Sequence, residues 1–425
     1  MLLKLQQTKY KEPHSHEAAQ YPLVLHLQEH QETKNNQLIL FIHGLGGTRY
    51  GKKSTWGKFP KFVFEDIPQL DVGLYEYRSL TGRLPFWKSI PLGKEARVLA
   101  EIIRDELANY KTIILVGHSM GGLLCKAVIS SLITTCEKDA LSRIGGLILM
   151  ASPQLGSIRV PRFLSFLSPD SKALETHGDF VTEINETFEN HLYPDEHIHM
   201  VGKTTIPTWV VQGASDFWVD PLSSGIGLAS NRIKVVHGSH TDIVKPKNKN
   251  IGAYEWVRER IQICLSRYKY DVFLSSAMAG LKTEADYQTY RTEALNLDNI
   301  LKTHCGSNSV YYAGRDLKTM AMFEAQNLSL QEDFNALKDS RYFMLVYPKK
   351  IVSSVLFEAG WALAMGKPSV YFVHKRDDLP FLMAQAGDAH VESKVITYEY
   401  GSKGREEIAR LLVEHGEKLW SSTGI

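Results

Sequence analysis

The sequence predicts a two-domain α/β protein in which each domain is built on a mostly parallel sheet. Its 425 residues are too many for one ordinary hydrophobic core. In both halves short buried strands alternate with amphipathic helices, a pattern typical of parallel sheets covered on both faces. A helix over residues 251–267 is expected to close the first domain, and a new buried strand begins directly after Tyr268. We therefore expect domains at residues 1–267 and 268–425.

The composition excludes several classes of function. With 49 Lys and Arg against 47 Asp and Glu, the formal charge is only +2, so we expect no nucleic-acid partner. Four cysteines lie far apart without metal-ligand spacing or a CxxC pair, which indicates a reducing compartment and no metal site. The N-terminal segment lacks a signal-peptide core, and no apolar run reaches the roughly 18 residues that span a bilayer. These features predict a cytoplasmic protein that needs no cofactor.

The stretch from Lys111 to Ile133 is the most informative part of the chain. Thr112 to Val116 is a run of β-branched and leucine residues, which predicts a strand buried on both faces. Gly117, Ser119 and Gly121 form a tight turn, and apolar residues then recur at helical spacing. Strand, sharp turn and helix together are the context that exposes a serine hydroxyl above a sheet. Ser119 is therefore the predicted nucleophile.

Later strand ends supply candidates for the acid and the base. A nucleophilic serine needs an imidazole to take its proton, and the imidazole needs a carboxylate to fix its tautomer. Asp216 follows a strand expected over residues 207–212, and Asp220 in the same loop is a rival. His240 follows the next expected strand, and His237 is a weaker rival. The chain order is therefore serine, acid, histidine.

Two further features of the first domain can be predicted. Pro22 to Leu27 and Gln37 to Ile42 read as two strands joined by a polar stretch, as in a hairpin. The second strand ends in the glycine-rich turn 43–47, whose backbone amides could face a developing oxyanion. Residues 158–200 read as an insertion that is either a lid over an apolar substrate or a pair of crossover helices.

These residues give the first domain a family resemblance. Residues 20–265 resemble α/β-hydrolases of the lipase and esterase kind: HGLGG resembles their oxyanion loop, GHSMGG their nucleophile elbow, and SDFWVDP and SHTDIVKP their acid and histidine loops. The resemblance implies an α/β-hydrolase fold and a lipid or other acyl-ester substrate, with transient contact with a membrane surface. It also implies that the backbone amides of Leu45 and Met120 form the oxyanion hole.

The second domain carries its own candidate, Glu358. Strands expected at 310–313, 341–347 and 369–373 belong to a small parallel sheet of about five strands. Glu358 lies on an apolar helix, where an unpaired carboxylate is costly, and Gly360 would let a ligand approach. A glutamate on the solvent face of an amphipathic helix is the alternative.

This half resembles TIR domains and the related nucleoside deoxyribosyltransferases, which implies a flavodoxin-like α/β domain. DVFLSSAMAG resembles their first strand and nucleotide-contacting loop, so Ser275, Ser276 and Met278 are implied to bind substrate. SVLFEAGWALAMGKPSVYF resembles the helix and strand that carry the catalytic glutamate, here Glu358. The implied reaction is cleavage of the N-glycosidic bond of NAD or a related nucleotide, in a homo-oligomer.

Three functions stay open at this point. The chain could be a two-enzyme protein, a lipase or esterase governed by a TIR-like nucleotide sensor or oligomerisation scaffold, or a scaffold that only binds partners. A scaffold has no need for a serine, an acid and a histidine in hydrolase order, so it is the least expected. By analogy with other TIR fusions we expect a bacterial immune effector against phage.

Overall fold

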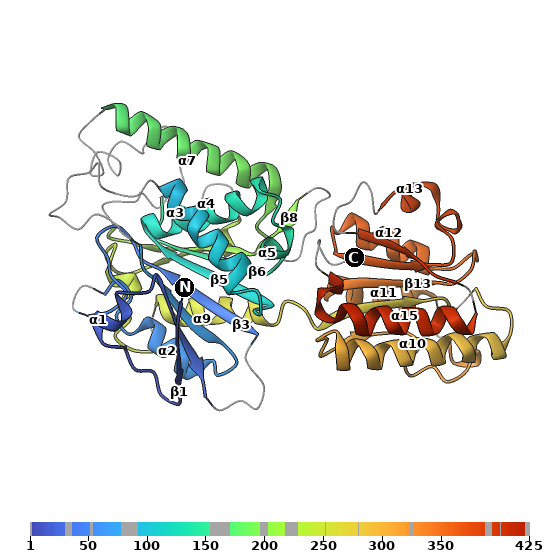
Figure 1. Ribbon diagram of the computed structural model, residues 1–425. Coiled ribbons are helices and arrows are strands. Elements are labelled where there is room, and N and C mark those ends of the chain that lie inside the picture. The colour runs from blue at the N-terminus through green and yellow to red at the C-terminus, as the bar shows by residue number, and fades with distance from the viewer. Residues whose placement is uncertain are drawn as a thin grey trace. The chain divides into compact units, whose positions relative to one another are not determined.

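The computed structural model describes residues 2–29, 36–51, 54–77, 92–153, 171–195, 203–216, 228–250, 252–278, 280–323, 326–386, 393–399 and 401–420. The chain divides into two compact units (Figure 1). The first unit comprises Met1–Ile198 and Lys203–Leu265, and the second comprises His199–Gly202 and Ser266–Ile425. Each unit contains its own sheet and its own hydrophobic cores.

An eight-stranded sheet organises the first unit, in the order β1-β2-β4-β3-β5-β6-β9-β10. All neighbouring pairs are parallel except β2 and β4, which are antiparallel. Strands β5, β6 and β9 are buried along their whole length, as expected for a sheet covered on both faces. The strands are β1 (Leu2–Gln7), β2 (Leu23–Gln28), β3 (Gln37–Ile42), β4 (Asp71–Tyr75), β5 (Thr112–His118), β6 (Ile144–Met150), β9 (Thr208–Gly213) and β10 (Ile233–Val236).

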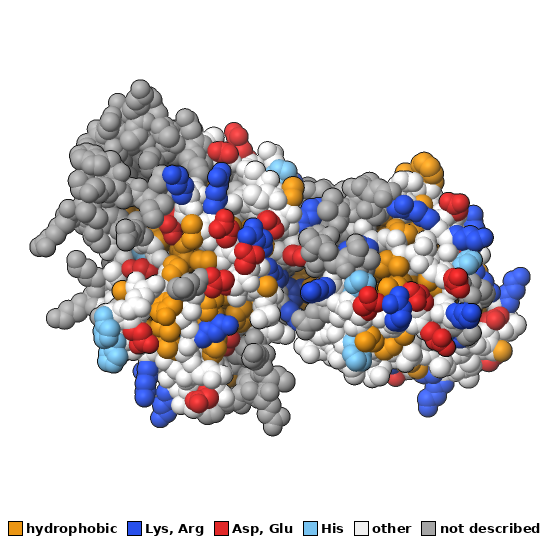
Figure 2. Space-filling model, viewed as in Figure 1, with side chains coloured by type: hydrophobic (Ala, Val, Ile, Leu, Met, Phe, Trp, Pro, Cys, Tyr) orange, Lys and Arg blue, Asp and Glu red, His pale blue; other side chains and the backbone are white. Residues whose placement is uncertain are grey.

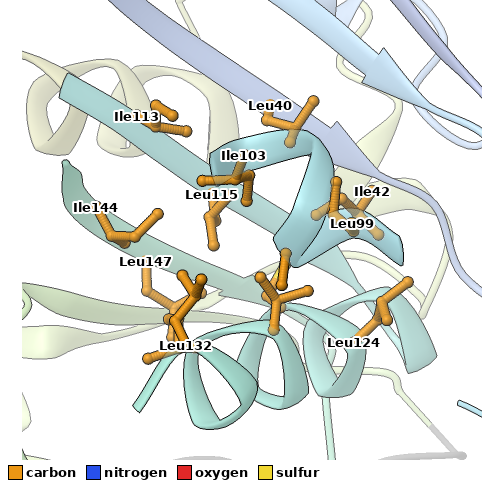
Figure 3. Packing of buried hydrophobic residues seen from close by; sticks show 14 of the residues in the cluster. Leu40, Ile42, Leu99, Ile103, Ile113, Leu115, Leu124, Leu132, Ile144 and Leu147 are labelled. Atoms are coloured by element: carbon orange, nitrogen blue, oxygen red, sulfur yellow. The ribbon is translucent and has the colours of Figure 1, made fainter. Parts of the chain in front are cut away.

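Helices cover this sheet on both faces and enclose two hydrophobic cores. On one face α3 and α4 pack on the central strands, and Leu99, Leu115 and Leu124 belong to the same buried core (Figure 3). On the other face α2 and α9 enclose an aromatic-rich core that includes Trp56 and Phe59. The helices are α1 (Ser15–Ala18), α2 (Phe59–Asp66), α3 (Leu92–Glu101) with a π-helical continuation (Ile102–Glu106), α4 (Met120–Thr134), α5 (Lys138–Ser142), α7 (Ser171–His191) and α9 (Ala253–Leu265).

Short elements complete the first unit. They are the small parallel pair β7 (Leu192–Tyr193) and β8 (Thr204–Thr205), and the 3-10 turns Ser230–Arg232 and Asp242–Val244. The second of these turns follows the predicted base, His240.

The hairpin expected from the first two predicted strands is wrong. Strand β4 lies between β2 and β3, antiparallel to the former and parallel to the latter. Gly73 of β4 explains the fit, because a Cβ there would lie 2.9 Å from Cδ1 of Leu40 in β3 and 3.1 Å from Cδ2 of Leu25 in β2. The leucines of both neighbours thus fill the space that a side chain at this position would need.

The second unit is a five-stranded, fully parallel sheet in the order β12-β11-β13-β14-β15. The expected separate second sheet is therefore present. After β11 the chain adds β12 on one side of it and then β13 on the other, so the strand order switches between β11 and β13. Open α/β sheets bind ligands at the carboxyl ends of the strands at such a switch point. The strands are β11 (Tyr270–Ser276), β12 (Val310–Tyr311), β13 (Ser340–Tyr347), β14 (Ser369–Val373) and β15 (Ser393–Thr397).

Helices lie on both faces of this sheet as well, and each face has a buried core. Helices α10 and α15 contact each other, while α11 and α12 pack together and both contact β11 and β13. The helices are α10 (Glu284–His304), α11 (Gln326–Lys338), α12 (Val355–Ala364), α13 (Phe381–Ala384) and α15 (Ser402–His415), with 3-10 turns at Met320–Met322, Arg376–Asp378 and Gly416–Trp420.

The visible surface of the described residues carries both signs of charge. Figure 2 shows Lys and Arg side chains interspersed with Asp and Glu on the second unit, in keeping with the small net charge. None of the helices in the described ranges has the length and apolar character needed to traverse a bilayer. Within the same ranges, His, Cys, Asp and Glu side chains form no group of three that could hold a metal ion.

Candidate active site

Ser119 lies between the end of β5 and the start of α4 with φ 53° and ψ −121°. A non-glycine residue in this region is strained by about 1–3 kcal/mol, and such strain concentrates at functional sites. The Ser119 N–H donates to the carbonyl of Met150 in the adjacent strand at 2.9 Å, which holds the turn in place. Gly121 lets the helix approach, because a Cβ there would lie 2.3 Å from the carbonyl oxygen of Ile42. The strand, strained serine and helix therefore have the geometry expected of a nucleophile elbow.

The predicted acid and base meet directly. Nδ1 of His240 lies 2.8 Å from Oδ2 of Asp216, whose side chain is fully buried. Because a carboxylate only accepts, Nδ1–H is the donor, and the lone pair of Nε2 stays free to take a proton. Asp220 lies outside the described residues, and His237 is exposed at the end of β10.

The loop that carries His240 is closed by a local hydrogen-bond pair. Both the N–H and the hydroxyl of Ser239 donate to Oδ2 of Asp242, at 2.9 and 2.6 Å. These bonds hold the pKa of Asp242 below its usual value, so the carboxylate stays ionised and the turn stays closed. The predicted base thus lies on a turn closed by Asp242, and its ring is bonded to Asp216.

The glycine-rich turn 43–47 lies against the elbow. A Cβ on Gly44 would lie 3.0 Å from the Cβ of Ser119, so the two backbones are in close contact. Within the described ranges, the amides of Leu45 and Met120 donate to no backbone carbonyl outside the regular elements. Of the two predicted oxyanion donors, Leu45 follows Gly44 in this turn and Met120 follows Ser119 in the chain.

Two aromatic rings that the sequence did not single out hold this turn. Nδ1–H of the buried His43 donates to the carbonyl of Gly44 at 2.8 Å, and the ring stacks on Tyr77 with centroids 4.5 Å apart. The hydroxyl of Tyr77 donates to the carbonyl of His43 at 3.0 Å. Burial lowers the pKa of His43, which keeps the ring neutral. The two rings thus hold the backbone of the glycine-rich turn 43–47. In the sequence, only the two-residue spacing of Tyr77 from Tyr75 at a strand end indicates this role.

The described part of the expected insertion is α7, which packs on the elbow helix α4. Lys126 of α4 is buried: its Nζ bonds Oδ1 of Asn185 and lies 4.6 Å from the ring centroid of Phe188, both on α7. Burial lowers the pKa of Lys126 to about 8. Residues 154–170 and 196–200 lie outside the described ranges, so the choice between lid and crossover stays a prediction.

In the second unit the structure brings Ser275 and Glu358 together. The hydroxyl of Ser275, near the end of β11, donates to Oε2 of Glu358 on α12 at 2.6 Å. Both side chains are buried, so the alternative of a solvent-facing glutamate is wrong. Burial raises the pKa of Glu358 to about 7; nearby Asp333 acts in the same direction, whereas hydrogen bonds from Ser275 and Ser354 oppose it. A carboxyl group of this kind changes charge near neutral pH.

This pair lies at the carboxyl edge of the second sheet, where β11 and β13 run side by side. Ser276 follows at the last position of β11 and is buried. The sulfur of Met278 lies close to Gly314, since a Cβ on this glycine would be only 2.8 Å from it. Gly360 is exposed, and a Cβ there would meet no atom within 4 Å, so the approach of a ligand at this glycine stays a prediction. The helical step of two residues turns it to the other side of α12.

Comparisons with known proteins agree with the fold of the first unit. Residues 39–244 match the model of the Alpha/beta hydrolase family. Protein SERAC1 of Danio rerio is 25% identical over 276 residues, which cover 56% of this chain and 41% of the relative. Protein SERAC1 of Homo sapiens is 24% identical over 286 residues, with 57% and 41% covered. The match thus spans about two fifths of the length of these curated relatives.

Solved structures include similar chains. A soluble variant of monoglyceride lipase from Saccharomyces cerevisiae matches with a TM-score of 0.37 and 13% identity, covering 58% of this chain and 91% of that one. Esterase B from Lactobacillus rhamnosis matches with a TM-score of 0.39 and 16% identity, covering 61% and 84%. Together with the mostly parallel sheet, the elbow and the acid–histidine pair, the match over residues 39–244 leads to one conclusion: the first unit has an α/β-hydrolase fold.

Proposed function

We propose that the first unit is a serine hydrolase that cleaves lipid or other acyl esters, with Ser119 as nucleophile, His240 as base and Asp216 as the acid. The observation that carries the proposal is the 2.8 Å bond between Nδ1 of His240 and Asp216, formed beside the strained elbow that presents Ser119. A buried carboxylate, an imidazole bonded to it and a strained serine are the parts that acyl transfer requires.

The chemistry follows from these groups. The Ser119 hydroxyl attacks the ester carbonyl while Nε2 of His240 takes its proton, and Asp216 stabilises the resulting imidazolium. The backbone amides of Leu45 and Met120 donate to the oxyanion of the tetrahedral intermediate. His240 then protonates the departing alkoxide. A water molecule, deprotonated by the same imidazole, releases the acid and restores the hydroxyl.

Hydrolysis of p-nitrophenyl esters of increasing acyl length tests this proposal. We expect Ser119→Ala to lose several orders of magnitude in kcat/KM. Ser131→Ala, twelve positions after Ser119 on helix α4 and partly exposed, is the matched control and should keep the wild-type rate. Activity that survives in Ser119→Ala would refute the assignment of the nucleophile.

We further propose that the second unit is a flavodoxin-like, TIR-like domain in which Glu358 cleaves the N-glycosidic bond of NAD or a related nucleotide. The support is a buried glutamate with a pKa near neutrality, bonded to Ser275 at the carboxyl edge of a doubly wound sheet. Ionised Glu358 would stabilise the ribosyl cation as neutral nicotinamide departs, which needs little acid assistance. Ser276 and Met278 at the same edge would contact the nucleotide.

The alternative is a TIR-like domain that binds a nucleotide without cleaving it and so controls the esterase, or that serves as an oligomerisation scaffold. Incubation of the purified protein with NAD, followed by chromatography of the products, separates the two. We expect nicotinamide from wild type and none from Glu358→Gln, with Glu332→Gln on the exposed face of α11 as control. Nucleotide binding that raises ester turnover without any nicotinamide would favour the sensor.

At the level of the cell, we propose a cytoplasmic, homo-oligomeric effector of bacterial antiphage defence that touches membranes only transiently. This rests on the association of the two domains rather than on any one residue. Loss of phage protection in both Ser119→Ala and Glu358→Gln strains would support a two-enzyme effector. Protection that survives in both would refute it.

A further inference from the structure

His118 occupies the position before the elbow serine and lies at the junction of three functional segments. It is the last residue of β5, and only 4% of its surface is exposed. Its Nε2 lies 2.9 Å from the backbone carbonyl oxygen of His240, and the two imidazole rings have centroids 4.8 Å apart. A Cβ on Gly44 would lie 2.9 Å from Nδ1 of the same ring. One side chain therefore contacts the base loop and the oxyanion turn, and belongs to the elbow strand.

The hydrogen bonds define the state of this ring. A carbonyl oxygen only accepts, so Nε2 of His118 carries the proton and Nδ1 has a lone pair. Among the described residues, Nδ1 is buried and has no hydrogen-bond partner. Burial lowers the pKa of His118 to about 3, and electrostatic interactions with the rings of His240 and His43 lower it as well. The hydrogen bond to the His240 carbonyl and the nearby Asp216 act in the opposite direction. The ring is neutral throughout the range in which His240 must work.

The unpartnered Nδ1 indicates why an imidazole is found here. A buried acceptor without a partner is a cost, and an apolar side chain of similar size would fill the space without it. The feature that an apolar side chain lacks is the Nε2–H donor to His240. Without this donor the peptide group after His240 is free to rotate, because nothing holds its carbonyl oxygen. Rotation of this backbone would turn the side chain of His240 away from its position.

From these contacts we infer that His118 is a positioning residue for the base: its Nε2–H fixes the backbone carbonyl of His240 and thereby aims the imidazole of His240 at Ser119. The inference rests on the proposed serine hydrolase function. It assigns no contact between His118 and the substrate. The hydrogen bond from His118 joins the base loop to the residue next to Ser119. Strand β5 therefore sets the distance between nucleophile and base.

The test compares variants by the rate at which a fluorophosphonate labels the full-length protein. His118→Leu keeps the bulk but removes the donor, whereas the amide of His118→Gln can still donate. We expect labelling to fall about 10- to 100-fold in His118→Leu and to recover largely in His118→Gln, since one hydrogen bond in a site contributes on this scale. In ester hydrolysis the loss should appear in kcat, with KM unchanged.

His26 provides the matched control. It is a fully buried histidine of β2, three strands away from β5 in the sheet, with Nε2 2.8 Å from the hydroxyl of Tyr50. His26→Leu should cost stability, as any buried histidine does, but leave the labelling rate of folded protein unchanged. A His118→Leu variant that labels at the wild-type rate would overturn the inference.

A second measurement on wild type works even if His118→Leu fails to fold. Nitrogen-15 NMR, assigned by the signal that disappears in His118→Gln, should report a neutral ring protonated at Nε2 from pH 5 to pH 9. A ring protonated at Nδ1, or one that titrates in this range, would overturn the inference. If wild type is not labelled at all, or Ser119→Ala is labelled equally well, the proposed hydrolase function fails instead.

Discussion

The buried carboxyl of Glu358 should make the stability of the second unit depend on pH, and Glu358→Gln should remove that dependence. Burial raises the pKa of this carboxyl from 4.5 to about 7. The folded state therefore binds the proton more tightly than the unfolded state. The stabilisation is complete below pH 4.5 and is lost as the pH rises through 7. Glutamine is neutral at every pH, and its carbonyl can accept the hydrogen bond from Ser275.

The size of the effect follows from the shift. A difference between 4.5 and about 7 corresponds to about 3 kcal/mol, at 1.36 kcal/mol for each pH unit. Relative to wild type, the stability of Glu358→Gln should therefore improve by about 1 kcal/mol at pH 5 and by about 3 kcal/mol at pH 8. Its activity toward NAD should be lost over the same range, because the amide cannot stabilise a cation. Greater stability together with lost activity is typical of a functional residue.

Hydrogen exchange along a urea series measures this difference for peptides of the second unit alone. The full-length chain is exposed to urea at pH 5, 6, 7 and 8, and the midpoint for β11 and α12 peptides is compared between variants. Glu332→Gln, an exposed glutamate of α11, should show no such trend. If the difference between wild type and Glu358→Gln is the same at every pH, Glu358 is already ionised in the folded protein and the reasoning is wrong.

Three further changes probe the hydrolase site. Asp216→Asn should lower kcat for ester hydrolysis by about 10³- to 10⁴-fold through the wrong imidazole tautomer, whereas Asp220→Asn should leave it unchanged; a larger loss at Asp220 would reverse the assignment. Gly121→Ala places a Cβ 2.3 Å from the carbonyl oxygen of Ile42, about 1 Å closer than an ordinary contact, so kcat for ester hydrolysis should fall about 100-fold. Gly360→Ala is its control, because a Cβ there has no atom within 4 Å. Thermal unfolding should show this variant to be about 0.5–1 kcal/mol more stable than wild type. Tyr77→Phe removes the hydroxyl that holds the oxyanion turn and should lower kcat several-fold at a stability cost of about 1 kcal/mol; Tyr110→Phe, which loses its bond to Asp71, should cost similar stability without changing kcat.

Local sequence predicted the parts of the fold that depend on one strand and its neighbouring turn. The elbow follows from the run of buried residues before Ser119 and the glycines around it, because those features determine strand, turn and helix without reference to other segments. The separate second sheet was also predicted from alternating strands and helices. Strand Ser369–Val373 begins and ends at the predicted residues.

Pairing between distant strands could not be predicted in the same way. β2 and β3 are consecutive, yet β4 separates them, since packing around Gly73 is decided by leucines on both neighbours. The edge strand β1 escaped notice because LLKLQQ is half polar, and only its parallel pairing with β2 makes it a strand.

The supporting residues of the site were equally hidden. His118 fills the variable position of GxSxG, and nothing in the sequence indicates that its ring reaches a carbonyl 122 residues further along the chain. His43 and Tyr77 stack only because two strand ends meet. Such residues act through contacts across the sheet, and these contacts have no local sequence signal.

The central claim is that Ser119 is the nucleophile of a triad with His240 and Asp216, and covalent capture tests it most directly. Full-length protein is incubated with a fluorophosphonate, digested, and the modified peptide is identified by mass spectrometry. We predict one modification, on Ser119, that is absent in Ser119→Ala and strongly reduced in His240→Ala. Equal labelling of wild type and Ser119→Ala, or modification at a different serine, would contradict the claim.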